Sequence, residues 1–125
     1  MENNKETYQN LFDDFMSAYK MGAVSAEEVG EIIARLAGYF CNYNLAAVQA
    51  ERVFAVIAKE NVLQNDEQSG KPISSAKAET ISAATNEASQ FKIAKAHVLN
   101  LETLIGSLKF LQKGLLQEFN QGNLS

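Results

Sequence analysis

Apolar residues between Ser75 and Phe119 recur at steps of three, four or seven positions. They are Ile81, Ala84, Ala88, Phe91, Val98, Leu101, Ile105, Leu108, Leu115 and Phe119. A helix of 3.6 residues per turn places such positions along one side, so the pattern predicts a single amphipathic helix over residues 75–119. At 1.5 Å per residue this helix would be roughly 65 Å long, about twice the width of a compact domain of this size. It therefore needs an equally long partner.

A second long apolar pattern supplies this partner. Two heptad series hold without a shift, one through Val29, Leu36, Tyr43, Ala50 and Ile57 and one through Ile33, Phe40, Ala47 and Phe54. At its start, Ser25 and Glu28 have the spacing of a capping box, in which each side chain bonds to the backbone amide of the other residue. We therefore predict one helix over about residues 25–64. A break near Asn42 or Asn44 is the alternative, because asparagine is a mediocre helix former.

A shorter pattern at the N-terminus predicts a helix over about residues 4–21. Its apolar face is rich in aromatic residues, and Gly22 follows at the position of a left-handed terminating residue. This periodicity is the ordinary signal of burial, so we interpret the face as core rather than as a docking surface.

The expected fold class is all-α. Residues 65–72 combine turn formers, glycine and the only proline, so they predict a loop that joins the two long helices. Ser74 or Ser75 would cap the last helix, and a kink at residues 85–87 is possible in it. Long helices joined in this way fold back antiparallel. The prediction is a single domain, residues 1–125, built on a long helical hairpin of about 25–64 and 75–119, with coiled-coil-like packing that assembles into a bundle.

Composition and charge narrow the function. The 125 residues are 46% hydrophobic and 21% charged, and the lone Cys41 rules out an internal disulfide. No apolar run approaches the roughly 20 residues of a membrane-spanning helix, and the N-terminus is polar, so we expect no membrane association and a cytoplasmic location. The net charge is −4; residues 1–70 hold eleven acids and five bases, whereas residues 71–125 hold six lysines and four glutamates. This distribution argues against a broad DNA-binding surface but allows a local anion site on the last helix.

The segment Gly70-Lys71-Pro72-Ile73-Ser74-Ser75-Ala76-Lys77-Ala78-Glu79 leads into the last helix, which contains Ala94-Lys95-Ala96 and Leu108-Lys109-Phe110-Leu111-Gln112. This C-terminal half resembles small all-helical accessory proteins of tailed bacteriophages, in which a Ser-x-Ala-Lys-Ala-Glu step precedes a long C-terminal helix. The resemblance implies a phage accessory protein in the host cytoplasm. It implies no function for individual residues.

Catalytic chemistry is poorly represented. The only histidine, His97, has no acidic residue three or four positions away, and metal sites usually need two or more converging ligands. Cys41 follows Phe40 and is expected to be an inert buried thiol. There is no Glu-x-x-His pair, no glycine-rich phosphate loop and no nucleophile elbow. We expect no enzyme activity, no metal and no cofactor.

Two groups of residues are candidates for ligand binding. Three lysines of the last helix, Lys95, Lys109 and Lys113, fall within about 40° around its axis, and Lys92 lies about 60° from Lys95. They suit a phosphate, although a solvated face opposite the apolar stripe is the favoured explanation. The second group consists of Tyr39, Asn42, Tyr43 and Asn44. Aromatic rings and amides together suit stacking on a base, although ordinary packing of an amphipathic helix also accounts for these residues.

The last helix also carries more apolar residues than one partner helix can cover. These candidates for an oligomer interface are Ile93, Leu99, Leu104, Phe110, Leu111 and Leu116. Because large exposed apolar patches usually mark interfaces, we expect a homo-oligomer, most simply a two-fold dimer. Three hypotheses follow: a non-enzymatic oligomeric helical protein that binds a protein partner, a protein that sequesters a nucleotide between subunits, and an accessory of single-stranded DNA handling.

Overall fold

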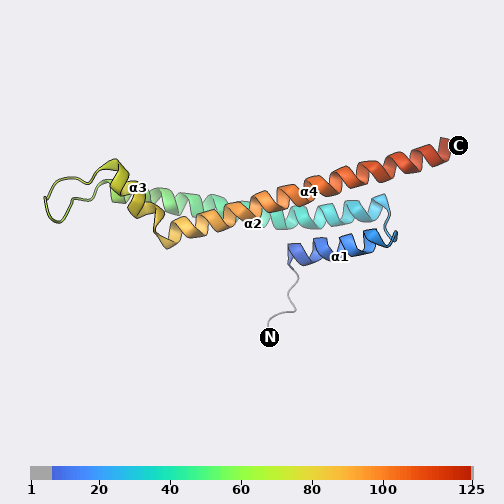
Figure 1. Cartoon of the computed structure of the whole chain (residues 1–125), viewed down its shortest axis with the longest axis horizontal. Coiled ribbons are helices and arrows are strands. Elements are labelled where there is room, and N and C mark those ends of the chain that lie inside the picture. Colours follow the sequence, from blue (N-terminus) through green and yellow to red (C-terminus); the bar gives the residue numbers. More distant parts are fainter. Residues whose placement is uncertain (1–6, 125) are drawn as a thin grey trace, which may run out of the picture. The chain divides into compact units, whose positions relative to one another are not determined.

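The structure is a computed structural model that describes residues 7–124, with side chains described up to residue 118. These residues form four helices, which are α1 (Tyr8–Lys20), α2 (Ala26–Val62), α3 (Ser75–Ala83) and α4 (Asn86–Leu124) (Figure 1). The predicted all-α class is confirmed. The chain divides into two compact units, of which unit 1 comprises residues 1–41 and 99–125 and unit 2 comprises residues 42–98.

In each unit α2 packs against α4, and the direction of the two helices is antiparallel. In unit 1 Gln112, late in α4, donates a hydrogen bond to the carbonyl of Ala26, at the start of α2. In unit 2 the ring of Tyr43 contacts His97, and further along α2 the ring of Phe54 stacks near Phe91. Residue numbers rise along α2 as they fall along α4, so the predicted helical hairpin is confirmed.

The helix α1 ends where its sequence predicts, whereas its start at Tyr8, with Thr7 as the N-cap, is later than the predicted start at about residue 4. The Thr7 hydroxyl accepts a hydrogen bond from the amide of Asn10 at 3.1 Å, and Gly22 follows the helix with a φ of +73°. Glycine adopts this left-handed backbone without the steric cost that a side chain would add. The apolar face is buried through Tyr8, Leu11 and Phe15. Residues 4–6 of the predicted helix lie outside the described residues.

The helix α2 is continuous over 37 residues. The capping box is present: the Ser25 amide donates to the Glu28 carboxylate and the Glu28 amide donates to the Ser25 hydroxyl, each at 3.2 Å. The helix runs through residues 41–44 without interruption, so the alternative of a break there is wrong. An unbroken heptad pattern decides the outcome over the weak helix propensity of two asparagines.

The prediction of a single helix over residues 75–119 is wrong, because the chain turns at Ala84 and Thr85, between α3 and α4. The Thr85 hydroxyl donates to the carbonyl of Ser82 at 2.7 Å and accepts from the amide of Ala88 at 3.1 Å. A threonine side chain that bonds to nearby backbone groups offers the chain an alternative to the helical ladder. The apolar pattern continues through this turn, so periodicity alone did not reveal the break.

The loop between α2 and α3 is organised by one carboxylate. Asp66 accepts hydrogen bonds from the amides of Gln68 and Ser69, at 2.8 and 3.3 Å, and its other oxygen lies 3.4 Å from the Lys77 ammonium. The hydrogen bond from the Gln68 amide, followed by those from Ser69 and Lys77, holds the pKa of Asp66 below its ordinary value. Ser74 caps α3 by accepting from the Lys77 amide. The loop therefore has a defined shape.

The two units have unequal cores. Unit 1 buries eight apolar side chains among its described residues: Tyr8, Leu11, Phe15, Val29, Leu36, Leu101, Leu104 and Leu108. Unit 2 buries three, which are Ala78, Ala88 and Val98. It also buries a polar pair, in which the Asn61 amide donates to the Ser82 hydroxyl at 2.9 Å. Unit 2 is therefore held mainly by part-buried contacts.

Candidate functional site

The predicted cluster of tyrosines and asparagines is divided between the two units. In unit 1 the ring of Tyr39 lies 6.2 Å from the ring of Tyr8, centroid to centroid. In unit 2 the ring of Tyr43 lies 4.5 Å from that of His97, with 32° between their planes. Asn42 and Asn44 are exposed. Each tyrosine thus contacts another ring of its own unit, and these contacts account for both rings without a planar ligand.

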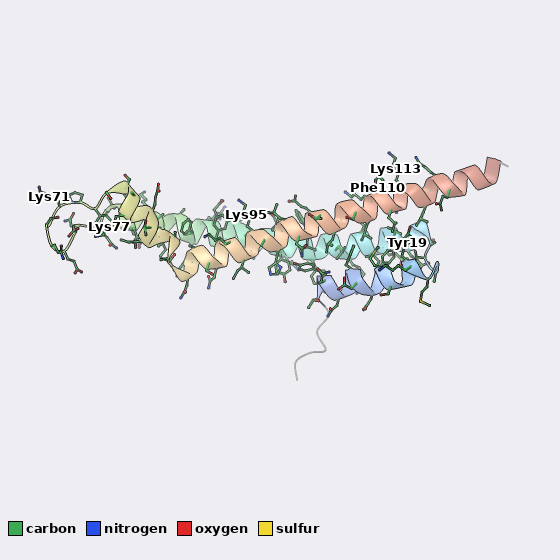
Figure 2. All side chains as sticks on the ribbon, in the orientation of Figure 1. Tyr19, Lys71, Lys77, Lys95, Phe110 and Lys113 are labelled. Atoms are coloured by element: carbon green, nitrogen blue, oxygen red, sulfur yellow. The ribbon has the colours of Figure 1, made fainter. Side chains whose placement is uncertain are left out.

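The four candidate lysines are all exposed, and each unit holds two of them. Lys92 and Lys95 belong to unit 2, where the Lys95 ammonium lies 6.0 Å from the centroid of the Phe91 ring, at the limit of a cation–π contact. Lys109 and Lys113 belong to unit 1. Figure 2 shows Lys95 and Lys113 on α4. Neither pair forms a concentrated basic face within its own unit.

Unit 1 has a groove that sequence reasoning missed. Its volume is about 370 Å³, and it is lined by Ile33, Ala37, Phe40, Glu102, Ile105, Gly106 and Lys109. Both helices contribute a small residue to this lining, Ala37 from α2 and Gly106 from α4. The sequence signal for this groove was a small residue on each of the two long predicted helices. Its floor is apolar, and Glu102 and Lys109 are exposed charged residues in its lining.

The predicted interface residues of α4 fall into three classes. Phe110 is 81% exposed, and Ile93, Leu99 and Leu116 are also exposed. Leu111 is part-buried. Leu104 is buried, so its assignment to an exposed surplus is wrong. It lies three residues after Leu101 and four before Leu108, both fully buried, and therefore belongs to the same apolar stripe.

A further apolar surface lies on α2 in unit 2. Five large side chains of this helix are exposed, namely Leu45, Val48, Val53, Val56 and Val62, and Leu63 follows directly after them. Leu45, Val48 and Val56 fall within about 80° around the helix axis at 100° per residue. We call the six residues the α2 apolar face. Their spacing was visible in the sequence but was hidden beside the stronger series that faces α4.

The lone cysteine and the possible metal ligands are the remaining candidates for chemistry in the described residues. Cys41 is exposed, so the prediction of a buried thiol is wrong. Consecutive helical residues point about 100° apart, and the part-buried Phe40 therefore does not bring its neighbour inside. Over residues 7–124, no three His, Cys, Asp or Glu side chains are grouped to hold a metal ion. In the same residues, no helix has the length and apolar character needed to cross a membrane.

Comparison with known proteins found no matching family model, curated protein or solved structure.

Proposed function

We propose that this protein is a non-enzymatic helical binding protein that self-associates and acts through protein–protein contacts. The observation that carries the proposal is the imbalance of unit 2. Its described residues expose eight large apolar side chains, six of them on the α2 apolar face, whereas they bury three apolar residues, two of which are alanines. A helix that is apolar on two sides and covered on one has a face available for a partner.

The energetic argument follows from area. Burying a large aliphatic side chain stabilises a complex by about 1.5–3 kcal/mol. Three or four residues of the α2 apolar face therefore suffice to offset a large part of the entropy that association costs, which is of order 4–15 kcal/mol. At 100° per residue Arg52 and Lys59 fall between Val48 and Leu45 around the helix, so they would place two charged groups within the contact and favour a partner that offers acidic side chains there.

The biological setting is part of the proposal. The resemblance of the C-terminal half to accessory proteins of tailed bacteriophages supports a phage protein that works in the host cytoplasm, on a host or phage protein. We propose neither a cofactor nor a catalytic step, because among the residues that the structure describes, 7–124, no three His, Cys, Asp or Glu side chains are grouped to hold a metal ion.

Native mass spectrometry of the protein purified from its own host tests the proposal. We expect an oligomer, or a complex with a second protein, that survives purification. The variant Leu45→Lys/Val56→Lys should lose any partner that binds the α2 apolar face. The control variant Leu45→Met/Val56→Ile keeps the apolar area and should retain it.

Two other results would redirect the assignment. A nucleotide retained in stoichiometric amount would favour the sequestering function, and DNA binding that weakens steeply with salt would favour single-strand handling. A clean monomer with no bound molecule, at all concentrations, would refute self-association and the sequestering function together.

A further inference from the structure

The geometry points to a specific partner for unit 1, which is a second copy of the same unit paired through α4 in antiparallel orientation. The two-fold axis passes between positions 104 and 105. The inference rests on the proposed self-association and deepens it, because it assigns the contact to one face of one helix and fixes the register.

The contact face consists of exposed residues at alternating steps of four and three. They are Leu99, Thr103, Gly106 and Phe110. At 100° per residue they fall within about 60° of one another around the helix, on the side opposite the buried Leu101, Leu104 and Leu108. We call these four residues the α4 seam. A 4-3-4 spacing is the spacing at which one helix packs along another. Figure 2 shows Phe110, which is more exposed than Leu99 at the other end of the seam.

The order of side chains along the α4 seam, large then small then small then large, is self-complementary when the second helix runs in the opposite direction. In a two-fold pair centred between positions 104 and 105, Leu99 faces the second copy's Phe110. Thr103 then faces the second copy's Gly106. Large side chains meet at the two ends and small ones meet in the middle, so two helices can approach closely. The symmetry repeats each contact, as an isologous interface requires.

The charges beside the α4 seam select the same orientation. Glu102 and Lys109 precede seam positions by one residue. In the antiparallel register the Glu102 of each copy lies diagonally across from the Lys109 of the other, offset by two residues or about 3 Å along the axis. In a parallel pair, Glu102 would instead lie across from Ser107 and Lys109 from Gly114. Within the described part of the chain, neither Glu102 nor Lys109 makes an ion pair, so both are available for a partner.

Gly106 agrees with this arrangement. A Cβ atom at this position would meet nothing within 4 Å in the chain, so the packing of unit 1 itself does not require a glycine. Glycine is the poorest helix former after proline, and its use inside a helix often marks the close approach of another backbone.

Sedimentation equilibrium of charge variants tests the register. We expect the wild-type chain to dimerise, and Glu102→Lys and Lys109→Glu each to weaken the dimer at least about tenfold, because each creates two like-charge pairs. The double variant Glu102→Lys/Lys109→Glu restores opposite charges and should return to within about threefold of wild type. Glu118→Lys, a reversal about 120° away from Gly106 around the helix, should change little.

A distance measurement provides a second test. A spin label on Glu118→Cys in a Cys41→Ser background leaves one labelled site per chain. The antiparallel register places the two labels 27 residues apart along the helix axis, or about 40 Å at 1.5 Å per residue. A parallel pair would place them side by side, near the interaxial distance of about 10 Å.

The outcomes separate the two proposals. Restored affinity in the double charge variant, together with a label distance near 40 Å, supports the inference. A dimer that ignores both single reversals, or that gives a short label distance, overturns the register and leaves self-association standing. A wild-type monomer at every concentration overturns both.

Discussion

Two glycines in the first half of α2 respond differently to the same substitution, and the structure predicts the size of the difference. Replacing glycine with alanine in a helix stabilises the folded state by about 0.5–1 kcal/mol. At Gly38 a Cβ atom would meet nothing within 4 Å, so Gly38→Ala should give the full gain. At Gly30 the Cβ would lie 3.0 Å from Nε2 of Gln112, tighter than an ordinary contact.

The cost at Gly30 is the displacement of a hydrogen bond. Nε2 of Gln112 donates to the carbonyl of Ala26 at 3.1 Å, and it lies at the end of a flexible side chain that can swing away. The lost bond removes about 0.5–1.5 kcal/mol and cancels the helix gain. We therefore expect Gly30→Ala to unfold with a free energy about 1 kcal/mol lower than that of Gly38→Ala. In a Gln112→Ala background the difference should vanish.

Urea denaturation followed by far-ultraviolet circular dichroism measures these free energies, with every variant at the same protein concentration, because self-association shifts apparent stability. An equal gain at Gly30 and Gly38 in the presence of Gln112 would refute the reasoning. So would a difference between the two sites that persists after Gln112→Ala.

Three further outcomes can be checked. Leu101→Ala, at a fully buried position, should lower the free energy of unfolding by about 2–5 kcal/mol in urea denaturation, whereas Leu99→Ala should change it by less than about 0.5 kcal/mol in the monomer. The stabilisation of the loop by Asp66 should be complete above the ordinary pKa of 3.8 and should be lost as the pH falls through the lowered pKa, because the amide of Gln68 stabilises the ionised form. An NMR titration of Asp66 with a midpoint at or above 3.8 would contradict this expectation. Thr85→Ala should cost about 1 kcal/mol and speed hydrogen exchange in the first turn of α4, and unchanged exchange there would show that the hydroxyl is not a cap.

Most of the fold is visible in the sequence because local and long-range signals agree. The capping box at Ser25 and Glu28 marks the start of α2, and the heptad series carries the helix past Asn42 and Asn44. The connection to the last helical region contains the only proline, Pro72, so the hairpin topology follows directly. At these places each signal points to the same structure.

The structure differs from the sequence prediction at positions where the contacts of a single side chain determine the local structure. Periodicity measures which side of a helix is apolar, and it does not detect the hydroxyl of Thr85 bonding to the backbone. Leu104 was assigned to the apolar surplus, yet it lies three residues from Leu101 and four from Leu108, and a helix buries positions at these spacings together. Cys41 was placed by its neighbour in sequence rather than by its angle around the helix.

The candidate site was less predictable than the fold. Aromatic residues such as Tyr39 and Tyr43 have the same sequence pattern whether they pack inside the protein or stack on a ligand. Their ring contacts with Tyr8 and His97 distinguish the two roles. The groove of unit 1 is lined by residues of both α2 and α4, so it depends on how these two helices pack. No pattern along one helix reports this arrangement.

The unequal cores of the two units imply unequal rates of local opening. Backbone amides of α2 in unit 1 are backed by Val29 and Leu36, whereas those in unit 2 have mainly small or part-buried neighbours. Because hydrogen exchange follows the free energy of local unfolding, amides after residue 42 should exchange sooner than those before it, although both belong to one helix. A single continuous helix would then contain one half whose amides exchange slowly and one half whose amides exchange fast. A ligand that covers the α2 apolar face would slow hydrogen exchange in the fast-exchanging half, and this slowing would report its binding.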